Sequence, residues 1–398
     1  MGVAPTIDWN TAQRIGELIA GSPPYGGELT RSIEPLAHDF ARRVGDYTGL
    51  ELPAELPPLE AVDRPGWIAA NLQTMRPLLD ALTESVAKED EDGAGDDRKA
   101  GRQGDGAPHR RSRAGAAQDL LSDSLNAASG HLLGAQLGAV TGLLSQRVLG
   151  QYDVSLLDSA TPPRLLLLTP NLAAAARNLH VDRDELVAWV AIHEITHAVQ
   201  FSGAPWLREH LGAMIRELLE GLQVSLAGRS SAGGGSDAGS GGGAHLPDPR
   251  ELLARARSGE LRELLERARR GELLRMTLGE DRWQLVERMQ SAMSLIEGHA
   301  EHTMDAVGAE VLPSLPRLRA AMTRRREARG LPWRVLERLL GLELKLRQYE
   351  VGRRFCDAVV QAAGPETLAV AWRSPAELPT AAELAEPSRW LKRVSVPA

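Results

Sequence analysis

The sequence predicts a mainly α-helical protein with a small β element. Apolar residues recur at spacings of three and four along most of the chain, which is typical of amphipathic helices. Two short apolar runs, residues 152–157 and 164–169, are bounded by prolines and favour strands. Two further segments contain almost no apolar residues and therefore cannot pack into a core.

Composition narrows the class of protein. With 398 residues, of which 43% are hydrophobic and 25% charged, the chain can bury a substantial core. The net charge of −7 argues against a nucleic-acid-binding protein. No run of 18 apolar residues occurs, so we expect no membrane span. Because Cys356 is the single cysteine and residues 1–10 do not resemble a signal peptide, we expect a reducing, cytoplasmic compartment.

The two segments poor in apolar residues divide the chain. Residues 88–116 form a charged linker that we expect to be disordered, and residues 228–247 form a flexible Gly/Ser insertion. We therefore expect an N-terminal helical region over residues 1–87 and a main domain over residues 117–398.

Four glycines follow one another at four-residue spacing in the segment after the charged linker. On a helix this spacing leaves a smooth stripe that a second helix can approach closely. The expected role of the stripe is helix packing rather than binding; its members are Gly130, Gly134, Gly138 and Gly142.

The most informative helix should begin at Asp182, with Glu185 reaching back to complete a capping box, and should end near Gly203. It contains the pattern HEITH, from His193 to His197. Residues four apart lie on the same side of a helix, so both imidazoles can bind one ion. Glu194 is rotated by about 100° from His193, where its carboxylate can reach water at that ion.

The two histidines continue a helical stripe that begins with Leu186 and Val190. Two uncompensated imidazoles on a buried face would be costly, so a metal site is favoured over a coincidence. Nitrogen ligands and an open position for water suit zinc, and we expect one zinc ion per chain. Manganese and iron would accept similar ligands.

The third ligand is less closely specified. A metzincin would have glycine at position 200 and histidine at position 203, but this chain has Gln200 and Gly203, which excludes that class. The better candidate is Glu297, on a downstream helix that we expect Thr277 and Glu280 to cap. Rival ligands are His299, His302 and, more weakly, His210.

The helix of Glu297 has further features of interest. Glu301 and Asp305 follow on the same face and could accept hydrogen bonds from the ligating histidines. Gly298 would let a neighbouring helix approach closely. The expected buried stripe consists of Met289, Met293, Ile296, Ala300 and Val307.

Other conspicuous residues have a weaker case. Tyr349 and Arg347 could donate hydrogen bonds to a developing oxyanion, although a helical tyrosine is more often a packing residue with a satisfied hydroxyl. We expect Trp206 and Cys356 to pack in the core. The basic run over residues 323–329 is typical of a solvated helix end.

Several stretches resemble the bacterial zincin-like metallopeptidase family, some of whose members are described as associated with biosynthesis of a deazaflavin coenzyme. These stretches are WVAIHEITHAVQF, PWLREHL, LIEGHAEHTMD and GLELKLRQYEVGRRFCDAVV. Weaker similarity extends through IDWNTAQRIGELI, VDRPGWIAANL, LLSQRVLGQYDV and PSRWLKRV. The resemblance thus covers nearly everything except the two linkers.

The resemblance implies a zincin-like metallopeptidase fold with zinc at His193 and His197 and with Glu194 as the catalytic carboxylate. In the related class with a glutamate as third ligand, Glu297 would complete the set. The spacing in that class is short, whereas 100 residues separate His197 from Glu297 here. The Gly/Ser insertion and residues 250–275 account for much of the excess.

Two hypotheses follow. The first is a zinc metallohydrolase acting on a peptide or amide substrate, with Glu194 moving the proton. The second is a non-catalytic, metal-stabilised binding or scaffold protein linked to deazaflavin coenzyme biosynthesis. A structural site has four protein ligands, so a residue such as His299 or His302 would have to close it. The oligomeric state is left open.

Overall fold

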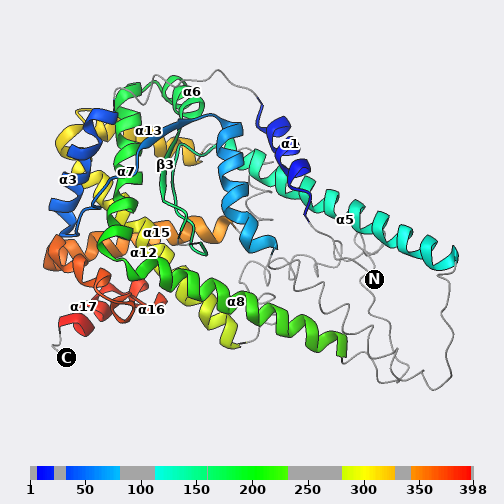
Figure 1. Cartoon of the computed structure of the whole chain (residues 1–398). Helices are drawn as coiled ribbons and strands as arrows, with labels where there is room; N and C mark the ends of the chain where they lie inside the picture. Colours follow the sequence, from blue (N-terminus) through cyan, green and yellow to red (C-terminus); the bar gives the residue numbers. More distant parts are fainter. Residues whose placement is uncertain are drawn as a thin grey trace, which may run out of the picture.

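The computed structural model describes residues 7–21, 33–80, 113–158, 160–231, 280–327 and 342–395. These residues form mostly helices, grouped around a small three-stranded sheet (Figure 1). The predicted fold class, mainly α with a small β element, is confirmed.

The elements, in chain order, are α1 (Trp9–Ala20), η1 (Glu34–Leu36), α3 (Ala37–Thr48), β1 (Leu59–Val62), a helix over residues 64–80, α5 (Arg113–Ser145), β2 (Gly150–Asp153), β3 (Arg164–Leu168), α6 (Thr169–Leu179), α7 (Arg183–Gly203), α8 (Trp206–Ser231), α12 (Glu280–Val311), α13 (Leu315–Glu327), α15 (Leu342–Ala363), η3 (Pro365–Trp372), η4 (Pro375–Glu377), α16 (Ala381–Ala385) and α17 (Pro387–Ser395).

Strand β3 is the centre of the sheet, with β1 parallel to it on one side and β2 antiparallel on the other. Its leucines are buried on both faces: Leu165 and Leu167 pack with α7, while Leu166 and Leu168 pack with α1 and the helix over residues 64–80. A continuous apolar run is what a strand covered on both faces requires.

Two strands were predicted after α5, and two are present, but the limits of one of them differ from the prediction. The second run forms β3 nearly as expected, whereas the first forms β2 at Gly150–Asp153 rather than at residues 152–157. Strand β1 was not predicted. Its four residues, Leu-Glu-Ala-Val, become a strand only because β3 offers them a parallel partner.

Helix α7 lies at the centre of the largest core, where α3, α6, α12 and β2 pack around it. Buried residues occur on every side of α7, which is typical of a helix enclosed by other elements. Figure 1 shows α3 beside α7, although the two are far apart in the sequence.

Residues 33–80 share this core with the later part of the chain. Helix α3 packs against α7 and α12, and β1 pairs with β3. The division into residues 1–87, 88–116 and 117–398 stays a prediction. Both predicted linkers overlap a helix end, since α5 begins at Arg113 and α8 ends at Ser231, and their remaining residues lie outside the described part of the chain.

The glycine stripe packs against α1, as expected. A Cβ atom added at Gly138 would lie 2.3 Å from the carbonyl oxygen of Ala12, and one at Gly134 would lie 2.3 Å from that of Asp8. The backbone N–H of Asp8 also donates to the carbonyl of Gly130 at 3.1 Å. The stripe is therefore a close helix–helix contact.

A second glycine contact joins α12 to α15. A Cβ atom at Gly298 would lie 2.1 Å from the backbone carbon of Gly352, and one at Gly352 would lie 1.8 Å from the carbonyl oxygen of Ser294. The expectation that Gly298 lets a neighbouring helix approach is confirmed, and that helix is α15. The crossing lies next to Glu297 in the sequence.

The C-terminal helices enclose the second core. Cys356 is fully buried there, and the indole N–H of Trp206 donates to the carbonyl of Trp372 at 2.9 Å, so both residues pack as expected. In the expected stripe of α12, Ile296, Ala300 and Val307 are buried and the two methionines are half-buried. The expected cap Thr277 lies outside the described residues.

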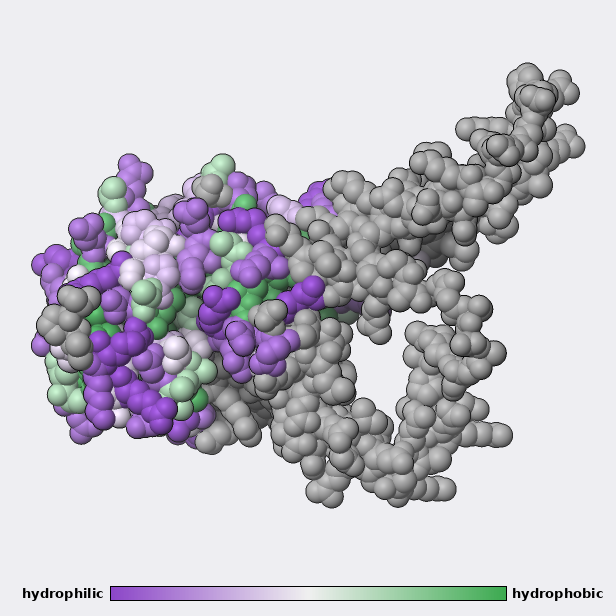
Figure 2. All heavy atoms as spheres, turned by 90° about the horizontal axis from the view of Figure 1, so that it is seen from below, coloured by the Kyte–Doolittle hydropathy of each residue, from purple (hydrophilic) through white to green (hydrophobic). Residues whose placement is uncertain are grey.

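The described surface is mixed in character. Figure 2 shows mostly hydrophilic residues on one face, with smaller hydrophobic patches between them. Thr323 and Arg324 of the basic run are exposed, while Arg325 donates to the carbonyl of Arg147 at 2.9 Å. None of the described helices is long and apolar enough to cross a membrane.

Candidate metal centre

Helix α7 begins and ends where the sequence indicates. The Asp182 side chain accepts a hydrogen bond from the backbone N–H of Glu185 at 2.9 Å, and the helix ends at Gly203. The expected capping box is not completed, because the Glu185 carboxylate accepts instead from the backbone N–H of Ser314 at 3.0 Å. Glu185 thus ties the start of α7 to the turn between α12 and α13.

Three side chains meet between α7 and α12. The Nε2 atoms of His193 and His197 are 3.2 Å apart. The Oε2 atom of Glu297 lies 3.7 Å from the first and 3.6 Å from the second. In the described part of the chain, no other group of three His, Cys, Asp or Glu side chains is close enough to hold a metal ion.

This triangle has the dimensions of a zinc site. Zinc–ligand bonds of about 2.0–2.1 Å in a tetrahedron place neighbouring ligand atoms about 3.3 Å apart. The three side chains are 21%, 9% and 20% exposed for His193, His197 and Glu297, so the cluster is not sealed off from solvent. The residues present therefore fit a zinc ion, with an open side.

The electrostatics of the cluster call for positive charge at its centre. Burial would lower the pKa of His197, but the carboxylate of Glu297 outweighs it and raises that pKa above its ordinary value. Burial would raise the pKa of Glu297, yet the two imidazoles hold it well below its usual range. Two ring nitrogens and a carboxylate oxygen at these distances favour a cation between them.

Glu194 lies against strand β2. The N–H of Leu168 donates to the carbonyl of Leu149, which makes these two residues a hydrogen-bonded pair of the antiparallel ladder. Because such pairs alternate with non-hydrogen-bonded ones, the backbone N–H and C=O groups of Gly150 and Tyr152 point away from β3. The N–H of Tyr152 donates to Oε2 of Glu194 at 2.7 Å. Burial raises the pKa of this carboxylate, while His193 and His197 act in the opposite direction.

Gly150 is required by this contact. A Cβ atom there would lie 2.7 Å from Oε1 of Glu194 and 2.7 Å from Val190. Sequence reasoning did not find Gly150 or Tyr152 as part of the site. The sequence signal for Gly150 was weak, because a glycine at the end of a strand is common. Only the packing of β2 on α7 gives this glycine its role.

Gln200 is a further residue of the site whose role sequence reasoning missed. Its Oε1 lies 2.8 Å from Nδ1 of His197, and its Nε2 lies 2.9 Å from the carbonyl of Ile296 and 2.9 Å from Nδ1 of His299. The position was noted only because it departs from the metzincin pattern.

The rival ligands lie elsewhere. His299 is buried between Gln200 and the ring of Trp372, and burial lowers its pKa to about 3. His302 has partners on both ring nitrogens: the hydroxyl of Tyr47 at 2.7 Å and the carboxylate of Asp357 at 2.6 Å. None of the rivals belongs to the metal cluster.

His210 and Asp305 also have other surroundings. His210 packs against the ring of Trp206 on α8. Asp305 pairs with Arg353 at 2.6 Å and Arg319 at 3.1 Å, and burial raises its pKa in spite of both arginines. Its carboxylate joins α12 to α15 and α13.

The ring of His193 lacks an orienting hydrogen bond among the described residues. Nδ1 of His193 is buried without a hydrogen-bond partner among the described residues, and Glu301 is buried on α12. The orienting role expected of Glu301 stays a prediction. The side chains of Tyr349 and Arg347 lie outside the described residues, so their role as hydrogen-bond donors to an oxyanion also stays a prediction.

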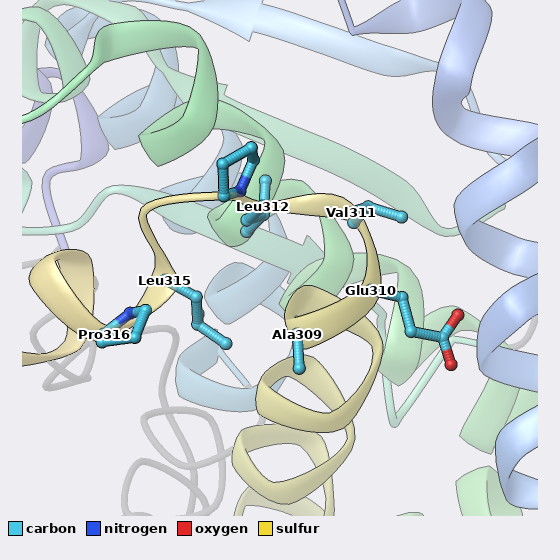
Figure 3. A pocket seen from close by; sticks show the side chains of 7 residues that line it. Ala309, Glu310, Val311, Leu312, Leu315 and Pro316 are labelled. Carbon is cyan, nitrogen blue, oxygen red and sulfur yellow. The ribbon is translucent and has the colours of Figure 1, made fainter.

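A separate pocket of about 370 Å³ lies at the turn between α12 and α13, lined by residues 309–313, 315 and 316 (Figure 3). Apart from Glu310, the side chains that line it are apolar, so they offer neither a ligand set nor a nucleophile.

Comparisons with known proteins identify the family of the chain. The sequence model of the zincin-like metallopeptidase family matches residues 7–391. A solved structure from Chloroflexus aurantiacus, described as "a putative hydrolase with a novel fold", is 25% identical with a TM-score of 0.61, covering 98% of this chain and 100% of that chain. A search of curated proteins finds no match. Because the family match spans nearly the whole chain, the protein belongs to the zincin-like metallopeptidase family.

Proposed function

We propose that this protein is a zinc-dependent hydrolase of peptide or amide bonds. His193, His197 and Glu297 hold the ion, and Glu194 is the general base. The observation that carries the proposal is the triangle of ligand atoms, with sides of 3.2, 3.7 and 3.6 Å, formed by the two HExxH histidines and Glu297.

The residues divide the work. A zinc ion held by these three residues would supply Lewis acidity, which would polarise a carbonyl and lower the pKa of water toward neutral pH. Glu194 is buried, and its raised pKa suits it to take a proton from water and to pass it to the leaving amine. Since Tyr152 holds Oε2, proton exchange falls to Oε1.

An open site supports a hydrolase over a non-catalytic scaffold. A structural zinc site needs a fourth protein ligand. Among the described residues, the two histidines that could close the site are engaged elsewhere, His299 by Gln200 and His302 by Tyr47 and Asp357. A scaffold would also have no use for Glu194 between the histidines.

The first test is the metal content of protein purified without added metal, measured by mass spectrometry. We expect about one zinc per chain in the wild type and in Glu194→Gln, and none in His193→Ala or Glu297→Ala. Zinc that survives in Glu297→Ala would remove Glu297 from the ligand set. A wild type without bound metal would contradict the site as a whole.

The second test is catalysis on a peptide library. We expect Glu194→Gln to lower turnover of any cleaved peptide by about 10²–10⁴-fold, the usual contribution of a positioned base. Asp184→Asn is the matched control, because Asp184 is an exposed carboxylate on the same helix. Equal turnover by Glu194→Gln and the wild type would refute the assigned role.

A further inference from the structure

A fully buried amide joins the two helices that carry the candidate ligands. Gln200 lies on α7, three residues after His197, and has no exposed surface. Its amide spans from the His197 ring to the backbone of α12 at Ile296, the residue before Glu297. The contact therefore connects two of the three candidate ligands through one side chain.

The partners of the amide fix its orientation. A carbonyl oxygen can only accept a hydrogen bond, so the group that faces the carbonyl of Ile296 must be the NH₂ group. The same NH₂ group faces Nδ1 of His299, which must then be an acceptor. The oxygen of the amide is left facing Nδ1 of His197 at 2.8 Å, so that nitrogen must carry a proton.

The orientation of the amide determines the state of the ligand. A neutral imidazole protonated at Nδ1 has its lone pair on Nε2. Nε2 of His197 is the atom that faces His193 and Glu297. In the neutral ring, the lone pair is thus directed at the centre of the cluster, where an ion would lie.

We propose that Gln200 is a positioning residue for the metal centre. It holds His197 in the tautomer that can bind an ion, and it fixes the separation of α7 and α12 beside Glu297. The inference rests on the proposed function, because it assumes that the cluster binds zinc. It assigns Gln200 no contact with substrate or with the ion.

The two histidines of the cluster differ in this respect. Nδ1 of His193 has no hydrogen-bond partner among the described residues, whereas Nδ1 of His197 has one. Loss of the amide would leave neither ring oriented. Partners of this kind change metal affinity by about 10–100-fold.

The test compares Gln200→Leu with Asn171→Leu. Asn171 is also a buried amide that donates to two backbone carbonyls, those of Ser145 and Val148, and accepts a hydrogen bond from Arg64. Both variants therefore lose a buried amide, but Asn171 lies on α6 and its amide has no hydrogen bond to the metal cluster. We expect zinc affinity, measured by competition with a chelator, to fall about 10–100-fold in Gln200→Leu and to stay unchanged in Asn171→Leu.

A rescue variant separates positioning from packing. Gln200→Glu keeps an oxygen for Nδ1 of His197 but loses the donors to Ile296 and His299. We expect it to recover most of the zinc affinity that Gln200→Leu loses, while its thermal midpoint without metal stays below that of the wild type. In ¹⁵N spectra of the metal-free protein, recorded above the raised pKa of His197 so that the ring is neutral, His197 should be the Nδ1–H tautomer in the wild type and a mixture in Gln200→Leu.

The outcomes distinguish this inference from the proposed function. If the wild type binds zinc and Gln200→Leu binds it equally tightly, the positioning role is refuted and the hydrolase proposal stands. A neutral His197 ring protonated at Nε2 instead of Nδ1 in the wild type would also refute it. If zinc affinity in the wild type does not depend on His193, the metal site itself is wrong and the inference falls with it.

Discussion

At the scale of single residues, a few short contacts organise the candidate site. The N–H of Tyr152 holds the Glu194 carboxylate at 2.7 Å, and Gly150 makes room for it. Gln200 does the corresponding work for His197. These partners come from a strand edge and from the last turns of α7, so the reactive groups are oriented by backbone and amide groups rather than by further charges.

Glu383 completes the capping box of α16, whose N-cap is Thr380, and pairs with Arg393 at 2.7 Å. Burial would raise the pKa of Glu383, but the hydrogen bonds from Arg393 and from the backbone of Thr380 outweigh it and lower that pKa. A lowered pKa in the folded state stabilises the protein above the unfolded pKa of about 4.3. This contribution is lost as the pH falls through the folded value.

We therefore expect Glu383→Gln to lower the free energy of unfolding by about 1 kcal/mol at pH 7, a modest value because Arg393 is partly exposed. The difference should shrink as the pH falls below about 4. Urea unfolding of both proteins across this pH range measures it. Glu386→Gln, which removes an exposed pair with Arg389, should have little effect at any pH. A deficit that persists in acid would contradict the ionic origin.

At the scale of elements, the site depends on how closely three helices approach one another. Helix α7 supplies the HExxH residues and α12 supplies Glu297, while α15 supports α12 from the other side at the Gly298–Gly352 crossing. Because the backbones touch there, the position of Glu297 relative to α7 is set by a contact with almost no freedom.

We expect Gly298→Ala to separate α12 from α15 and to cost at least about 2 kcal/mol of stability, because a Cβ atom would lie 2.1 Å from the backbone of Gly352. Zinc affinity should fall as well, since Glu297 is the preceding residue. Gly308→Ala on the same helix is the control: its Cβ atom would meet Leu315 at an ordinary 3.4 Å. That variant should be neutral or up to about 1 kcal/mol more stable. Equal thermal midpoints for the two variants would argue against the crossing.

At the scale of the whole molecule, the metal centre would act as a cross-link. His193 and His197 lie in the largest core, and Glu297 lies on a helix that borders both the first and the second core. An ion bound by all three side chains would tie these parts together, although the ligands come from distant parts of the sequence.

We expect removal of zinc by a chelator to lower the thermal midpoint of the wild type by several degrees. A ligand at 100 times its Kd contributes about 2.7 kcal/mol to stability. Scanning calorimetry with and without chelator measures the shift, and added zinc should reverse it. His193→Ala should show no such response. A thermal midpoint of the wild type that does not change with chelator would mean that the ion does not join the helices.

The sequence by itself determined the features that depend on neighbours along the chain. The spacing of His193, Glu194 and His197, the cap at Asp182 and the glycine stripe of α5 all follow from a repeat of about 3.6 residues per turn, and the structure agrees with each of them. The predicted Glu297 does meet the two histidines, while its role as a ligand awaits the metal analysis.

Only the tertiary structure decided which distant groups touch. No pattern along the chain indicated that β1 would pair with β3, that the N–H of Tyr152 would hold Glu194, or that Gln200 would bridge α7 and α12. The sequence also could not separate Glu297 from His299 and His302, which lie on the same helix within a few residues. Local spacing determines which side of a helix a residue occupies. The partner on that side depends on packing between distant segments, such as those of His197 and Glu297, which lie a hundred residues apart.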